Sequence, residues 1–105
     1  MLHSNLPESD FLKTVLEPLL ADFQYWFTRS HTLLENQEIP FLGSEKQANL
    51  LERVFQAHQE VNTARTLLMA TDGQVGVETS ILMAWHQLVA ECWQISTRLR
   101  AEKSV

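Results

Sequence analysis

Glycine and proline are scarce in this chain of 105 residues, which has only three of each. Both residue types mark turns, so the secondary-structure elements must be few and long. This scarcity argues against a sheet of many short strands and favours helices. Hydrophobic residues make up 45% of the chain, which is enough for one globular core and argues against extended disorder.

Cysteine and positive charge are also in short supply. Cys92 is the only cysteine, which excludes an internal disulfide and a cysteine-rich zinc site. The formal net charge is -5, and the 8 basic residues are scattered among 13 acidic ones, so we expect no binding to nucleic acid. The first ten residues lack the positive charge and apolar run of a secretory signal, and we therefore expect a cytoplasmic protein.

Apolar residues recur at alternating spacings of four and three along three segments, which is typical of amphipathic helices. The pattern predicts helices over about residues 9–36, 45–71 and 78–102. The first stripe consists of Leu12, Leu16, Leu19, Phe23, Trp26, Ser30 and Leu33, widened by Leu20, Phe27 and Leu34. The second consists of Leu50, Val54, Ala57, Val61, Ala64 and Leu68, and the third of Ile81, Trp85, Leu88, Cys92, Ile95 and Leu99.

Three long helices with short connections predict an all-α fold, an antiparallel up-down-up three-helix bundle that forms one domain over residues 1–105. Pro18 lies inside the first helix and removes a backbone hydrogen bond, so we expect a kink near it or a separate first turn. Ser44 and Gln47 have the spacing of a capping box at the start of the second helix. Asp72 and Gly73 predict a left-handed stop at its end.

The register of the helices follows from reflecting the chain about the two loop centres. To within about three residues, this places Phe23 level with Ala57 and Trp93, and it places Trp26 level with Val54 and Ser96. Bulky aromatic side chains would then face small partners, as a close-packed core requires.

Cys92 and the histidines are the residues in which catalytic or metal chemistry would be sought. The register places Cys92 level with His58, but a lone cysteine in a core stripe is more often a small apolar residue than a nucleophile. The Glu-x-x-His pattern of di-iron bundles is absent at His31, His58 and His86. We therefore assign no catalytic, cofactor-binding or metal-binding residue and expect neither enzyme activity nor a cofactor.

Residues 77–97 are apolar on nearly all sides of the predicted third helix, with Glu78 and Glu91 as the only charges. One core stripe does not account for this surface, and polar residues within the run argue against a membrane span. A protein interface, including self-association as a homodimer, is one explanation; broad coverage by the other two helices is the other. The loop residues Ile39, Phe41 and Leu42 are also apolar, and they either dock a partner or close the end of the bundle. The candidate interface residues are Leu82, Met83, Val89, Trp93, Ile39, Phe41 and Leu42.

Three stretches of the chain resemble a small, uncharacterised family of helical proteins from cyanobacteria. They are LEPLLADFQYWFTRSHTLL at residues 16–34, ATDGQVGVET at residues 70–79 and MAWHQLVAECW at residues 83–93. The resemblance carries no catalytic motif and implies no functional residue. It implies a cytoplasmic setting in a photosynthetic bacterium, where small helical proteins often serve as assembly or regulatory accessories.

Taken together, these features predict a non-enzymatic protein-interaction module, an adaptor or accessory factor that acts through apolar helical surface. The alternative is a bundle that binds a small ligand or pigment between its aromatic side chains, of which there are three Trp, five Phe and one Tyr.

Overall fold

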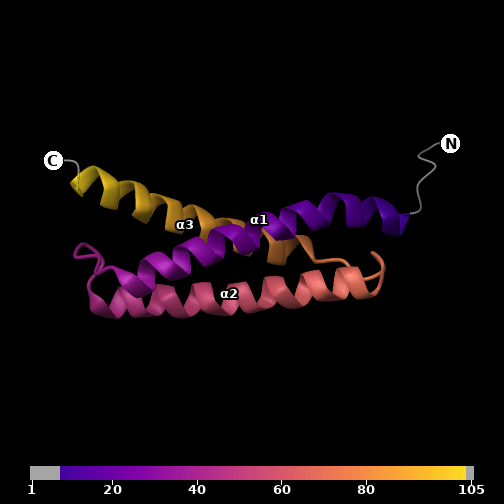
Figure 1. Ribbon diagram of the computed structural model, residues 1–105, viewed down its shortest axis with the longest axis horizontal. Helices are drawn as coiled ribbons and strands as arrows, with labels where there is room; N and C mark the ends of the chain where they lie inside the picture. Colours follow the sequence, from indigo (N-terminus) through magenta and orange to yellow (C-terminus); the bar gives the residue numbers. More distant parts are fainter. Residues whose placement is uncertain (1–7, 104–105) are drawn as a thin grey trace.

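The computed structural model describes residues 8–103, which form three helices (Figure 1). Helix α1 spans Glu8–Asn36, α2 spans Ser44–Ala70 and α3 spans Thr79–Lys103. The helices run up, down and up, so the predicted all-α, antiparallel three-helix bundle is confirmed. Each observed boundary lies within one residue of the boundary expected from the sequence.

The core lies mainly between α1 and α2, which pack closely along their lengths. On α2 the expected stripe is buried almost as predicted, with Ala64 half-buried at its edge. On α1 the buried side is centred on the residues that widen the stripe, because Leu20 and Phe27 are fully buried whereas Leu19 is exposed. The buried apolar residues of α1 are Leu16, Leu20, Phe23, Phe27 and Leu34.

Helix α3 is displaced along the bundle relative to the register expected from the loops. Trp26 packs edge-on against Trp93 at 5.2 Å between ring centroids, and Phe23 packs against Trp85 at 5.6 Å. The expected pairing of Phe23 with Trp93 is therefore wrong. The reason is that residues 71–78 do not make a tight reversal but run back along the bundle before α3 begins (Figure 1).

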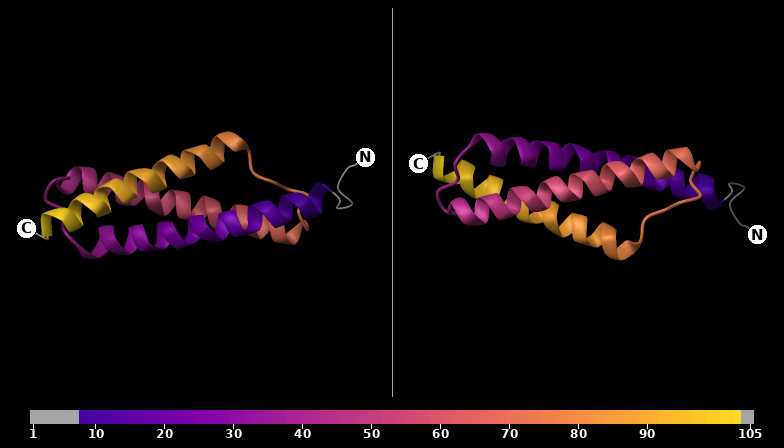
Figure 2. Two further views of the ribbon diagram at one scale, coloured as in Figure 1. Left: turned by 90° about the horizontal axis from the view of Figure 1, so that it is seen from above. Right: turned by 90° about the horizontal axis from the view of Figure 1, so that it is seen from below.

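This displacement gives the molecule an elongated form of 57 × 24 × 19 Å. Figure 2 shows that α3 crosses the α1–α2 pair obliquely and that its first turns stand away from both partners. Arg53 and Glu91 form an ion pair of 2.7 Å that joins α2 to α3, and Trp85 Nε1 donates a hydrogen bond of 3.0 Å to Glu60. The early part of α1 is left without a helix over its α3-facing side.

Pro18 lies within α1, and the helix continues through it. Figure 1 shows that the axis of α1 changes direction in the part of the helix that contains this proline. Pro18 is exposed, so the carbonyl that it leaves without a backbone partner lies on the solvent side of the helix. The chain thus accommodates the proline by a bend and not by a separate first turn.

The predicted capping box at the start of α2 is wrong. Gly43 occupies the N-cap position, and no side chain caps the helix there. The Gln47 side chain instead reaches back to α1 and the loop: its amide nitrogen donates to the carbonyls of Leu34 and Gln37, and its oxygen accepts from the Ile39 N–H. These bonds satisfy backbone groups at the end of α1 that have no partner within the helix.

The predicted left-handed stop at the end of α2 is confirmed. Asp72 and Gly73 both have positive φ, of 53° and 86°. The Gly73 N–H donates to the Leu68 carbonyl at 2.8 Å and the Asp72 N–H donates to the Met69 carbonyl at 3.2 Å, which is the pattern of a Schellman motif.

Candidate interaction surface and groove

Exposed apolar side chains gather in the half of the bundle where α1 begins, α2 ends and α3 begins. Of the eleven large apolar side chains recorded as exposed in the described part of the chain, eight lie in these segments. We call this set the apolar half: Phe11, Val15, Leu19, Leu67, Met69, Val75, Ile81 and Met83. Figures 1 and 2 show that the three segments lie towards the same end of the molecule.

The displacement of α3 explains why these residues are exposed. Phe11, Val15 and Leu19 recur every four residues and lie on the side of α1 that carries Trp26 and Leu33 further along, where α3 covers it. Ile81 lies four residues before Trp85, on the core-facing side of α3, yet 41% of it is exposed. The surface thus includes sides of two helices that would be buried if another helix lay over them.

The connection between α2 and α3 is fastened beside this surface. Lys13 Nζ forms an ion pair of 2.9 Å with Asp72, and this hydrogen bond and the carboxylate's charge raise the pKa of Lys13. A Cβ at Gly76 would lie 3.8 Å from the side chain of Leu16, so the loop passes close over the core there. Both contacts hold the loop against α1 while Phe11 and Val15 remain uncovered.

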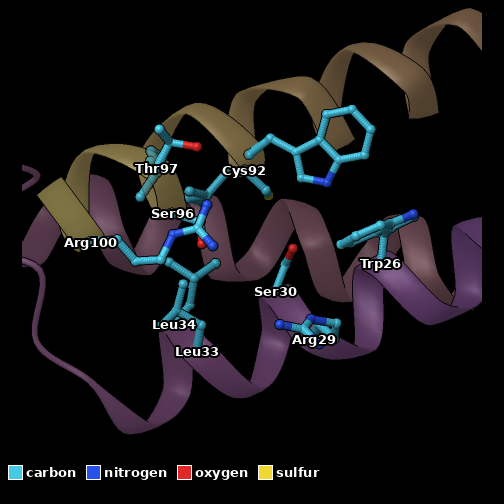
Figure 3. A pocket seen from close by; sticks show the side chains of 12 residues that line it. Trp26, Arg29, Ser30, Leu33, Leu34, Cys92, Ser96, Thr97 and Arg100 are labelled. Atoms are coloured by element: carbon cyan, nitrogen blue, oxygen red, sulfur yellow. The ribbon is translucent and has the colours of Figure 1, made fainter.

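A second feature lies further along, where α3 does cover α1. A groove of about 510 Å³ opens between the two helices. Trp26 and Arg29 line it from α1 and Arg100 lines it from α3 (Figure 3). Trp93 of α3 also lines it and packs edge-on against Trp26. The groove is lined by Trp26, Arg29, Ser30, Leu33, Leu34, Leu50, Cys92, Trp93, Ile95, Ser96, Thr97 and Arg100.

Cys92 is a buried thiol at the side of this groove, and Ser30 is its hydrogen-bond partner. Burial raises the pKa of the Cys92 thiol, the Glu91 carboxylate raises it further, and the hydrogen bond with Ser30 and the charge of Arg53 partly oppose them. His58, which was expected to lie level with Cys92, has its Nε2 3.4 Å from the Thr28 hydroxyl. The surroundings of Cys92 therefore favour the neutral thiol over the nucleophilic thiolate.

We predict that native Cys92 reacts slowly with iodoacetamide, at less than about a tenth of the rate in urea-unfolded protein, because the reagent needs an accessible thiolate. Rapid labelling of the folded protein would contradict the burial of Cys92.

The pH dependence of stability gives a second prediction. Because the pKa of Cys92 is raised in the folded state, the stability that comes from the neutral thiol is fully present below the unfolded pKa of about 8.5 and is lost as the pH rises through the folded pKa. Unfolding free energies of wild type and Cys92→Ala should therefore converge in alkaline solution. A constant difference between the two unfolding free energies up to high pH would contradict the raised pKa of Cys92.

The structure separates the candidate interface residues into three groups. Met83 and Trp93 are exposed, at 58% and 47%. Leu82, Phe41 and Leu42 are half-buried and pack against the core. Val89 and Ile39 are buried: Val89 does not lie on the outer surface expected for it, and Ile39 lies where the alternative of closing the bundle's end places it.

Both placements have a physical cause. The buried side of α3 includes Trp85, Val89 and Cys92, so Val89 is buried where the expected stripe had Leu88, which is half-buried. Ile39 closes the end of the core beneath the Gln47 hydrogen bonds.

Sequence analysis did not identify Phe11 and Val15 as candidates. Their four-residue spacing, which continues to Leu19, was the signal that could have indicated them. It is weak, because these residues lie next to the stronger core stripe of Leu12 and Leu16 in the same helix.

Residues 8–103 contain no group of three or more His, Cys, Asp or Glu side chains arranged to hold a metal ion. Within the same range, no helix combines the length and the apolar character needed to cross a membrane.

The fold and the exposed apolar side chains define the chain as a small, elongated helical-bundle protein. A family model described as a protein of unknown function, DUF2605, matches residues 6–101, and the chain belongs to this family. Searches of curated proteins and of solved structures give no match.

Proposed function

We propose that this chain is a non-enzymatic protein-interaction module that pairs with a second copy of itself through the apolar half. The observation that carries the proposal is the concentration of exposed apolar side chains where α3 leaves α1 uncovered. Large apolar side chains exposed in such number within one half of a small protein are typical of interfaces. An adaptor or accessory role, acting through such a dimer, follows from this proposal.

The arrangement on α1 favours a second copy as the occupant. Phe11, Val15 and Leu19 are evenly spaced, so a twofold axis passing near Val15 would place Phe11 of one copy opposite Leu19 of the other. The stripe can thus face its own copy with apolar side chains on both sides of the axis.

Phe11→Glu should split this dimer. Twofold symmetry brings each substitution into the interface twice, so two carboxylates would lose water, each against the apolar Leu19 of the other copy. We expect the dissociation constant to rise at least about tenfold, which corresponds to about 1.4 kcal/mol. Sedimentation velocity at several protein concentrations measures this constant.

Phe55→Glu is the matched control. Phe55 is 45% exposed, compared with 53% for Phe11, but it lies in the middle of α2 outside the apolar half. This variant should associate as the wild type does, and circular dichroism should show that both variants keep their helical content. Equal association of Phe11→Glu and wild type would refute the proposed interface.

A further inference from the structure

Three aromatic side chains and one arginine form a continuous cluster where α1 packs against α3. The Tyr25 and Trp26 rings meet edge-on at 5.0 Å between centroids, and Trp26 meets Trp93 at 5.2 Å. The Arg29 guanidinium lies 5.7 Å and 5.9 Å from the ring centroids of Tyr25 and Trp26. We call these four residues the aromatic cluster. Tyr25 is 53% exposed and Trp93 is 47% exposed, so packing of the core does not account for the cluster.

Contacts within the aromatic cluster hold its side chains in place. Arg29 donates a hydrogen bond of 3.1 Å to the Tyr25 hydroxyl, four residues earlier in α1. Trp26 is half-buried and packs against the core. Side chains that are already ordered lose little conformational entropy on binding, and Trp, Tyr and Arg are the residues most enriched at the energetic centres of protein interfaces. The cluster therefore has the composition and the order of a binding surface.

The aromatic cluster also offers hydrogen-bond donors. Trp85 Nε1 donates to Glu60, whereas the indole N–H groups of Trp26 and Trp93 have no acceptor in the described part of the chain. Every buried side-chain nitrogen and oxygen of a residue that is not exposed has a partner there, so the half-buried Trp26 side chain does not bury its N–H group. An indole N–H donates and cannot accept a hydrogen bond. A ligand of this surface must therefore supply acceptors.

The groove beside the aromatic cluster narrows the charge of the ligand. Trp26, Arg29 and Trp93 line this groove of about 510 Å³, and its lining includes no Asp or Glu. A positively charged ligand would find no counter-charge in the groove and would be repelled by Arg29, which forms no ion pair with any described residue. The surface thus suits an uncharged, apolar chain that is rich in hydrogen-bond acceptors.

We propose that the aromatic cluster binds a proline-rich segment of a partner protein in the polyproline II conformation. Such a segment has no internal hydrogen bonds, and it presents carbonyl acceptors but few donors because proline has no backbone N–H. Its carbonyls accept from the indole N–H groups while its rings pack against the aromatic rings, which is the way that aromatic-lined grooves recognise this conformation. None of the four residues belongs to the apolar half, so the site does not depend on the proposed dimer.

Isothermal titration with capped decaproline, which has no charge and no aromatic residue, tests the proposal. The wild type should bind it with a Kd below about 1 mM, and Trp93→Ala should bind at least about tenfold more weakly, because a ring and a donor are lost. Phe55→Ala is the matched control: it removes a side chain of similar exposure, 45%, from α2 outside the cluster, and it should bind as the wild type does. Tyr25→Ala should also weaken binding, and it serves in place of Trp93→Ala if circular dichroism shows that variant to be unfolded.

Other peptides and the association state distinguish other occupants. A flexible peptide of five Gly-Ser repeats should bind at least about tenfold more weakly than decaproline. Equal binding of these two peptides, equal binding by Trp93→Ala and Phe55→Ala, or no binding of decaproline at about 1 mM would overturn the proposal. Tighter binding of an amphipathic helical peptide would instead identify a groove for a helix. Weaker self-association of Trp93→Ala than of Phe55→Ala would assign the surface to a second copy, and either result would also overturn the proposal.

Discussion

Replacing Val89 with glutamate is expected to unfold much of the protein at moderate temperature. Val89 is 5% exposed and lies in the core cluster with Trp85 and Cys92. A carboxylate there would lose its water without gaining a partner, which costs about 3–5 kcal/mol. That is a large part of the 5–15 kcal/mol that usually stabilises a domain, so the melting temperature should fall by about 15 °C or more.

Thermal denaturation followed by circular dichroism measures this effect, with Phe55→Glu as the control. Phe55 is a larger apolar residue than Val89 but is exposed, so its replacement should change the free energy of unfolding by less than about 1 kcal/mol. If Val89→Glu melted within a few degrees of the control, Val89 would have to lie on the surface, and the packing of α3 described here would be wrong.

Gln47→Ala is expected to be the most damaging substitution of an exposed or half-buried polar residue. It removes the hydrogen bonds to Leu34 and Gln37 and leaves the Ile39 N–H without its acceptor next to a fully buried side chain. The expected loss is about 2–3 kcal/mol, because unpaired backbone groups near the core pay their desolvation cost without compensation. Urea denaturation at equilibrium measures the free energy of unfolding.

Gln59→Ala is the control for this prediction, since Gln59 is an exposed glutamine of the same helix. Alanine has the higher helix propensity, so the control should be neutral or slightly more stable than the wild type. A similar result for Gln47→Ala would show that solvent replaces the three hydrogen bonds at little cost, and that Gln47 does not hold the loop.

The fold class could be predicted because the relevant signals are local. The apolar spacing, the turn at Asp72 and Gly73 and the scarcity of other glycines determine where helices begin and end. The buried side of α2 could be predicted as well, because a single stripe of apolar residues faces α1 along its whole length.

The packing of α3 could not be predicted from the same signals. Helical periodicity gives the angular position of a residue around its helix, but not the shift of one helix along another or their crossing angle. Residues 71–78 could have formed a tight reversal, and only their extended path along the bundle moves Trp93 beside Trp26. This shift buries Val89 and exposes Ile81, and it leaves Phe11 and Val15 uncovered.

The role of Gln47 was missed for a related reason. Its spacing from Ser44 fits a capping box, but its side chain donates instead to the carbonyls of Leu34 and Gln37. The distance of these carbonyls from α2 depends on the path of the loop, which the spacing does not give. The groove was likewise invisible in the sequence, because the α1 and α3 residues that line it are far apart along the chain and come together only where the two helices pack.

Sedimentation equilibrium of the unmodified protein, over about a hundredfold range of concentration reaching tens of micromolar, tests self-association most directly. The monomer has a mass of 12.1 kDa, and we expect the weight-average mass to rise with concentration towards twice that value. Dilution should return it to the monomer value, as mass action requires. A mass that stayed at 12.1 kDa over the whole range would contradict the claim that the apolar half joins two copies of the chain.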